Sequence, residues 1–314
     1  MIIDDLDQKF VAGLQEGRDR LENHYVIISI KGGLRVFLSE RVTVVSLAIL
    51  LGVIFVGVFG PMLTPYDYQT SHTDEDGELL RAEAPSADHL LGTNQQGQDV
   101  LSRLIYGARP TLITGFLGGT IILVTGLTIG VTAGYFGGLI ESALMRFTDF
   151  VYGIPLIPTA IVIVAFFGIG FWKSILIIGG LLWRGNARVF RSQVLQIKER
   201  PYVRSAEALG GSSRYVIFKH ILPNLGGMMV LFFALGIGVS ILISASLSFL
   251  GVTSPFIPSW GVMLRNAYGS GLMTSAWWWA LPPGFMISIT VLTTFMLGRG
   301  YERVQKAKSE GVQV

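Results

Sequence analysis

The residue types that usually carry enzyme chemistry are sparse in this sequence and do not converge on one site. The sequence has no cysteine, which excludes disulfides and thiolate metal sites. It also lacks the G-x-x-x-x-G-K-[ST] loop that cradles nucleotide phosphates. We therefore expect no catalytic residue, no metal site and no cofactor in this polypeptide. The four histidines are scattered, and none stands at metal-ligand spacing from another histidine or from a carboxylate pair: His24, His72, His89 and His220.

The composition indicates a membrane protein. Apolar residues make up 51% of the chain and charged residues 14%, whereas soluble domains usually carry about a quarter charged residues. Because about 20 apolar residues span a bilayer as a helix, we predict an all-α membrane protein with six transmembrane helices. Five spans is the alternative, if residues 143–190 are wrongly divided. The six spans are expected near 42–61, 110–134, 143–169, 172–190, 225–250 and 278–298.

The placement of charged residues predicts the orientation of these spans. The 62–107 segment holds two basic residues against eight acidic ones, whereas the 184–220 segment holds eight Lys and Arg against two acids. Lys and Arg mark cytoplasmic loops, so we expect 184–220 and both termini inside and 62–107 outside. The overall charge of +3 then reflects topology and does not indicate nucleic-acid binding.

This pattern predicts one membrane domain with a small polar insertion. The first apolar run begins near Val42, behind a long segment of mixed charge, so we interpret it as an uncleaved anchor rather than a signal peptide. The expected organisation is a cytoplasmic segment 1–41, a transmembrane domain 42–298 with the extracytoplasmic insertion 62–107, and a cytoplasmic tail 299–314.

A basic, helix-forming segment stands between two long apolar runs. Residues 202–224 read YVRSAEALGGSSRYVIFKHILPN, and they resemble the EAA loop of ABC importer permeases, through which an ATPase subunit acts on a transmembrane pore. The family pattern is E-A-A, three residues, G, nine residues and I-x-L-P; its first Glu and its Ile are absent here. The matched positions are Arg204-Ser205-Ala206 for E-A-A, Gly210 for the glycine, and Leu222-Pro223 for L-P.

Further segments resemble the C-type permeases of dipeptide, oligopeptide and nickel ABC importers. They occur in register from residue 89 to residue 264 and so cover most of the chain. The segments are HLLGTNQQGQDVLSRLIYGAR (89–109), AGYFGG (133–138) with LMRFTD (144–149), LSFLG (247–251) and PSWGVML (258–264).

The resemblance implies the permease subunit of a type I ABC importer in the cytoplasmic membrane of a prokaryote. The implied partners are a homologous second permease, two ATPase subunits that bind ATP and Mg, and an extracytoplasmic solute-binding protein. The cytoplasmic loop 197–223 would be the coupling loop. Its candidate coupling residues are Arg204, Ser205, Ala206, Glu207, Ala208, Leu209, Gly210, Arg214, Tyr215, Leu222 and Pro223.

Two stripes of small residues allow more than one interpretation. Gly126, Gly130, Gly134 and Gly138 recur every four residues, which favours close helix packing, either within this chain or against the second permease. In the next-to-last span, Ser240, Ser244 and Ser248 share one face. These serines are candidates for the translocation path, and helix packing is the alternative.

The cargo remains open at the level of sequence. In the relatives that this chain resembles, the position of Ser244 is commonly Glu, so its replacement raises an oligosaccharide as an alternative to the di- or oligopeptide that the family implies. A stand-alone secondary carrier is the alternative from another class, but the spans lack the buried acidic or histidine chains that proton coupling needs. We also expect an ion pair between Arg146 and Asp149, and an interfacial aromatic belt at 277–279.

Overall fold

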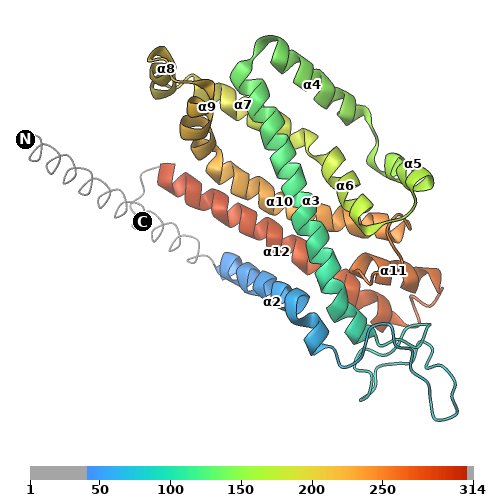
Figure 1. The fold of residues 1–314 in the computed structure, drawn as a ribbon. Coiled ribbons are helices and arrows are strands. Elements are labelled where there is room, and N and C mark those ends of the chain that lie inside the picture. The colour runs from blue at the N-terminus through green and yellow to red at the C-terminus, as the bar shows by residue number, and fades with distance from the viewer. Residues whose placement is uncertain (1–40, 310–314) are drawn as a thin grey trace, which may run out of the picture.

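The computed structural model describes residues 41–309, with side chains described as far as residue 303, and this part of the chain is helical with isolated β-bridges and no strand. Four long helices form the body of the molecule (Figure 1), and α3 and α12 each pack against α2 and α10. They are α2 (Arg41–Leu63), α3 (Val100–Phe136), α10 (Leu222–Phe249) and α12 (Trp277–Ser309). The remaining helices are α4 (Gly138–Gly153), α5 (Leu156–Phe167), α6 (Phe171–Leu182), α7 (Arg184–Lys198), α8 (Pro201–Ala208), α9 (Ser213–Val216), the π-helix η1 (Ile217–Ile221) and α11 (Trp260–Gly269).

Helix α2 turns its small residues inward and its large apolar residues outward. Gly57 lies against Ala108 and Leu112 of α3, and Gly60 lies against Ile105. Large apolar side chains such as Phe55 are exposed on the opposite side. This arrangement suits a helix in lipid, where close backbone approach holds helices together and the outer face needs no polar residues.

The length and apolar character of the described helices bear out a multi-pass membrane protein. Four helical stretches could cross a membrane: Arg41–Leu63, Val100–Phe136, Ser213–Phe249 and Trp277–Arg303. A fifth is counted if α4 and α5, which are bent by 82° at their junction, form one span. Residues 41–303 thus hold four or five candidate spans rather than the six expected from the sequence, and the difference lies in residues 143–190.

The break between α4 and α5 follows from a proline. Ile154 is extended, with φ −82° and ψ 114°, as is favoured for a residue before proline, and Pro155 then caps α5. The expected span 172–190 is also divided, into α6 and α7. Trp183 between them keeps helical backbone angles, so the chain runs on in nearly the same helix.

Helix α3 begins ten residues before the expected span 110–134, so the last residues of the predicted insertion 62–107 are helical. Asp99 caps the helix, because its carboxylate accepts a hydrogen bond from the Ser102 amide at 2.7 Å.

The α11 helix is a second difference, since no helix was expected between α10 and α12. Ser259 caps α11, and the buried Trp260 donates its indole N–H to the Leu104 carbonyl at 2.9 Å.

The expected aromatic belt at 277–279 is not formed as a unit. Trp277 is exposed, but Trp279 is 1% exposed and belongs to the apolar core around Trp260. Trp278 lies against the backbone of Gly92 in the insertion. The three residues begin α12, and successive helical residues point about 100° apart, so they cannot share one surface.

Candidate coupling segment

Helix α8 ends in a tight glycine turn. The Gly210 amide donates to the Glu207 carbonyl at 3.0 Å, and the Gly211 amide donates to the Ala206 carbonyl at 3.0 Å. These two bonds make a Schellman motif, which needs a residue with positive φ after the helix. Gly210 has a φ of +84°, as the sequence predicts.

After this turn the chain runs into α10 without a gap. Ser212 caps α9 by accepting a hydrogen bond from the Tyr215 amide. The π-helix Ile217–Ile221 joins α9 to α10, and Leu222 and Pro223 form the first turn of α10. Pro223 is tolerated at this position because a π-helical turn shifts the hydrogen bonds that precede it. A displacement of α9 would therefore act directly on α10.

One buried apolar cluster connects α8 and α9 to α3, α7 and α10. Val203 of α8 and Val216 of α9 are both fully buried. Interior side chains are close-packed and transmit displacement, so α8 and α9 should move with the helices that share the cluster. The other members are Val131 and Tyr135 from α3, Phe190, Val194 and Ile197 from α7, Ile221 from η1, and Leu225 from α10.

The turn itself projects an apolar tip. The side chain of Leu209 is 89% exposed, and Tyr215 and Phe218 are also exposed. Leu209 stands at the turn, Tyr215 on α9 and Phe218 on η1. Arg204 forms an ion pair with Glu199 of the same chain, so its charge is already paired, whereas Arg214 has no ion pair among the described residues.

The end of α3 contacts both sides of the turn. Lys198 at the end of α7 donates to the Tyr135 carbonyl at 2.8 Å and lies 5.4 Å from the Tyr135 ring centroid. The Tyr135 side chain packs in the same buried cluster as Val203 before the turn and Val216 after it. Tyr135 thus positions the turn relative to α3.

Three arginines on one face of α7 hold α4. Arg188 pairs with Asp149 at 2.6 Å, and Arg191 pairs with Glu141. Arg184 donates to the carbonyl of Val151 at 2.6 Å, near the end of α4. The expected pair between Arg146 and Asp149 is therefore wrong, because Asp149 faces α7 rather than its own helix.

The glycine stripe of α3 lies against α7 in the same chain. A Cβ at Gly126, Gly130 or Gly134 would come within 3 Å of α7 atoms. Gly138 does not belong to this contact. It begins α4 with a φ of +55°, and no atom lies within 4 Å of its Cβ position, because α3 ends at Phe136.

The serine stripe of α10 is buried within the chain, which favours the helix-packing alternative over a place in the translocation path. Ser240 is fully buried against Gly118 of α3. Ser248 is 1% exposed and accepts a hydrogen bond from the Thr253 hydroxyl at 2.8 Å. Ser244 lies between them and is 9% exposed.

A groove opens on another face of α10, which sequence reasoning missed. Ser246 lines it, together with Leu242 and Phe249 from the same helix. Leu264 of α11 and Ser288 of α12 complete its walls, and the groove has a volume of about 500 Å³. Residues two positions apart in a helix point about 200° apart, so Ser246 and the predicted Ser244 lie on different faces of α10.

Residues 41–303 contain no group of three or more His, Asp and Glu that could hold a metal ion. His220 lies between Tyr202 and Tyr215, with ring centroids at 6.0 and 5.3 Å, so it packs within the coupling segment. His24 lies outside the described residues.

Two family models match the chain. One, described as a binding-protein-dependent transport system inner membrane component, matches residues 126–305. The other, described as the N-terminal TM domain of oligopeptide transport permease C, matches residues 31–85.

Several relatives are similar over most of their length. The dipeptide transport system permease protein DppC of Bacillus subtilis is 34% identical over 84% of this chain and 81% of the relative. The glutathione transport system permease protein GsiD of Pectobacterium atrosepticum is 34% identical over 85% and 87%. The oligopeptide transport system permease protein OppC of Haemophilus influenzae is 32% identical over 85% and 84%. Among solved structures, an inward-facing MetNI methionine ABC transporter has a TM-score of 0.49 and 17% identity, over 65% of this chain and 95% of that chain.

Proposed function

The chain belongs to the family of inner membrane components of binding-protein-dependent transport systems, and we propose that residues 201–216 couple it to an ATPase subunit. It is a permease subunit of an ATP-driven importer. The observation that carries the coupling proposal is the exposed Leu209 at the Schellman turn, set on a helix whose Val203 is fully buried in a cluster shared with α3, α7 and α10.

The mechanism uses the rigidity of this connection. An ATPase subunit that binds the exposed Leu209 side chain displaces α8 and α9 together, because Val203 and Val216 share one buried cluster. The π-helix then transmits the displacement to α10, and the packing of Tyr135 in the same cluster transmits it to α3. Both helices re-orient around the path, which gives alternating access. ATP and Mg would be held, and ATP hydrolysed, by the partner ATPase subunits.

The partners and the topology follow the same proposal. A second permease would complete the path, two ATPase subunits would bind on the side of residues 201–216, and a solute-binding protein would deliver cargo on the side of the insertion. The acidic insertion 62–107 would be extracytoplasmic and the Arg-rich segment 184–220 cytoplasmic, with both termini inside.

A di- or oligopeptide is the cargo that we propose. Relatives named for dipeptide, oligopeptide and glutathione transport support it. The argument for a neutral oligosaccharide depended on an uncharged Ser244 facing the path, and Ser244 is buried between helices instead. The groove beside Ser246 has a mainly apolar wall with two hydroxyls, which suits peptide side chains and backbone.

The test of coupling is a pair of substitutions at the tip. In proteoliposomes with the complete importer, Leu209→Asp should abolish cargo-stimulated ATP hydrolysis and uptake, because a charge cannot enter an apolar cleft without a large desolvation cost. Leu209→Met keeps an apolar side chain and should keep both activities. Full coupled uptake by an assembled Leu209→Asp complex would reject the coupling assignment.

A further inference from the structure

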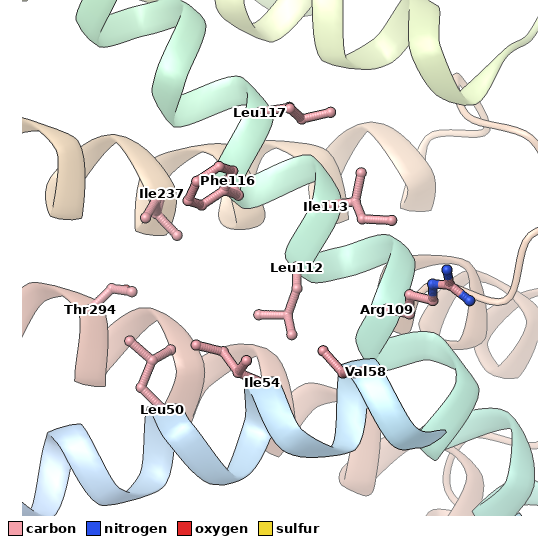
Figure 2. A pocket seen from close by; sticks show the side chains of 11 residues that line it. Leu50, Ile54, Val58, Arg109, Leu112, Ile113, Phe116, Leu117, Ile237 and Thr294 are labelled. Atoms are coloured by element: carbon pink, nitrogen blue, oxygen red, sulfur yellow. The ribbon is translucent and has the colours of Figure 1, made fainter. Parts of the chain in front are cut away.

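An apolar groove runs along the outside of the helical bundle between α2 and α3, with α10 and α12 at its floor (Figure 2). Its volume is about 600 Å³, within the range of ligand pockets. Side chains of Ile54, Leu112 and Phe116 form its walls, and Ile237 and Thr294 close it from behind. Because α2 and α3 are both long and apolar enough to cross a membrane, we expect this groove to lie at membrane depth.

Arg109 is the charged residue among those that line the groove. In Figure 2 it lies at one end, whereas Leu50 and Thr294 lie at the other. The Arg109 backbone lies beside Gly57, and Gly57 is six residues before the end of α2. In the sequence, Arg109 directly precedes the apolar run 110–134. Arg109 is therefore near the level at which hydrocarbon gives way to headgroups on the side of the insertion.

The guanidinium of Arg109 has no hydrogen bond or ion pair with any other described residue, and no described carboxylate pairs with it. The neighbouring Arg103 differs, since it donates to the Tyr68 carbonyl at 3.0 Å and to the Gln98 side chain. A cation at the edge of hydrocarbon is costly unless it reaches water or an anion. In a bilayer, the anion at this level is the phosphate of a lipid headgroup.

From this geometry we propose that the groove binds one phospholipid, with its phosphate on Arg109 and an acyl chain along Ile54, Leu112 and Phe116. The two parts of the site match the two parts of the ligand. A free anion would leave the apolar walls exposed, and a neutral hydrocarbon would leave Arg109 without a partner. Arg–phosphate hydrogen bonds are charge-assisted and often bidentate, so one arginine is enough to select a phosphate headgroup.

The test is native mass spectrometry of the complete importer, purified in mild detergent and titrated with dioleoyl-phosphatidylglycerol. Arg109→Gln should lower the affinity for one bound lipid about tenfold, which is the loss expected for one charge-assisted hydrogen bond. Arg81→Gln is the matched control, because Arg81 lies in the insertion and outside the groove, and it should retain the lipid. Dioleoylglycerol, which has no phosphate, should bind the native importer weakly and should not distinguish the two variants.

A second pair of variants tests the acyl-chain part. Ile54→Trp should exclude the lipid by filling the groove, whereas Leu51→Trp, on the exposed side of α2, should not. Equal lipid retention by Arg109→Gln and native importer would overturn the proposal.

Crosslinking from a single cysteine at Val58→Cys tests the alternative occupant. Efficient crosslinking to the second permease would also overturn the proposal, because that subunit would then occupy the groove. The chain has no cysteine of its own to interfere.

Discussion

Gly130 of α3 lies so close to Ala187 of α7 that a Cβ at Gly130 would come within 2.6 Å of the Ala187 carbonyl oxygen. Helix α7 therefore packs against α3 on one side. On the other side it is bound to α4 by the ion pairs of Arg188 and Arg191. The α3–α7 contact is thus a rigid unit on which the coupling segment is mounted.

We expect Gly130→Ala to destabilise the chain by about 1–3 kcal/mol, the usual cost of overpacking. Gly180→Ala in α6 is the control, since no atom lies within 4 Å of its Cβ position. That change should be neutral or slightly stabilising, because alanine favours a helix over glycine. Thermal unfolding of the detergent-solubilised importer measures both effects. An equal melting temperature for the two variants would contradict the close contact.

The turn after α8 gives a prediction about backbone conformation. No atom lies near the Cβ position of Gly210, so a substitution there meets strain but no clash. Gly210→Val should reduce coupled uptake strongly, because a β-branched residue at positive φ distorts the turn that carries Leu209. Gly210→Asn should retain most activity, because Asn tolerates this conformation. Uptake and ATP hydrolysis in proteoliposomes separate the outcomes, and a fully active Gly210→Val importer would contradict a role for the turn.

The two faces of α10 should respond differently to the same substitution. Ser240→Leu places a large side chain against Gly118 and should prevent assembly of a stable subunit. Ser246→Leu projects into the groove beside Phe249 and should leave assembly intact while it reduces peptide uptake. Size-exclusion chromatography reports assembly, and uptake of a labelled peptide reports transport. Normal uptake by the assembled Ser246→Leu importer would show that this groove is not part of the translocation path.

Hydropathy alone predicts the long helices, because a run of 20 apolar residues has few alternatives to a membrane span. It does not predict which face of a span is buried, since Ser240 and Ser246 occupy equally apolar surroundings in sequence. The burial of Ser240 depends on Gly118 of α3, which is more than 100 residues away. Short helices such as α11 were missed for a similar reason. Its stability comes from Trp260 in the core and a distant Leu104 carbonyl, not from a periodic pattern.

Local chemistry was more predictable than tertiary pairing. The positive φ of Gly210 follows from a glycine after a helix-forming run, which needs no distant partner. The partner of Asp149 could not be found in this way. Arg146 and Arg188 both offer a guanidinium, and the choice depends on α4 lying against α7.

The insertion should lose stability in mild acid because of His72. Its ring contacts those of Tyr66 and His89, with centroids at 4.6 and 4.7 Å. Burial and then repulsion from His89 lower the pKa of His72 below its usual value of 6.5, and Asp99 offsets this only in part. Asp99 is also the hydrogen-bond partner of His89, at 2.9 Å, and caps α3, so the cluster connects the insertion to the membrane domain.

The sign of the pH effect follows from this lowered pKa. The unfolded insertion takes up a proton on His72 near pH 6.5, whereas the folded one resists it, so the contribution to stability is complete above about pH 6.5 and is lost as the pH falls through the lowered pKa. Hydrogen exchange of amides in residues 64–99 should therefore accelerate between pH 7.5 and pH 5, roughly, after correction for the intrinsic exchange rate. His72→Gln removes the titrating group and should flatten this dependence. Parallel pH profiles for the native chain and His72→Gln would show that another group controls the stability of the insertion.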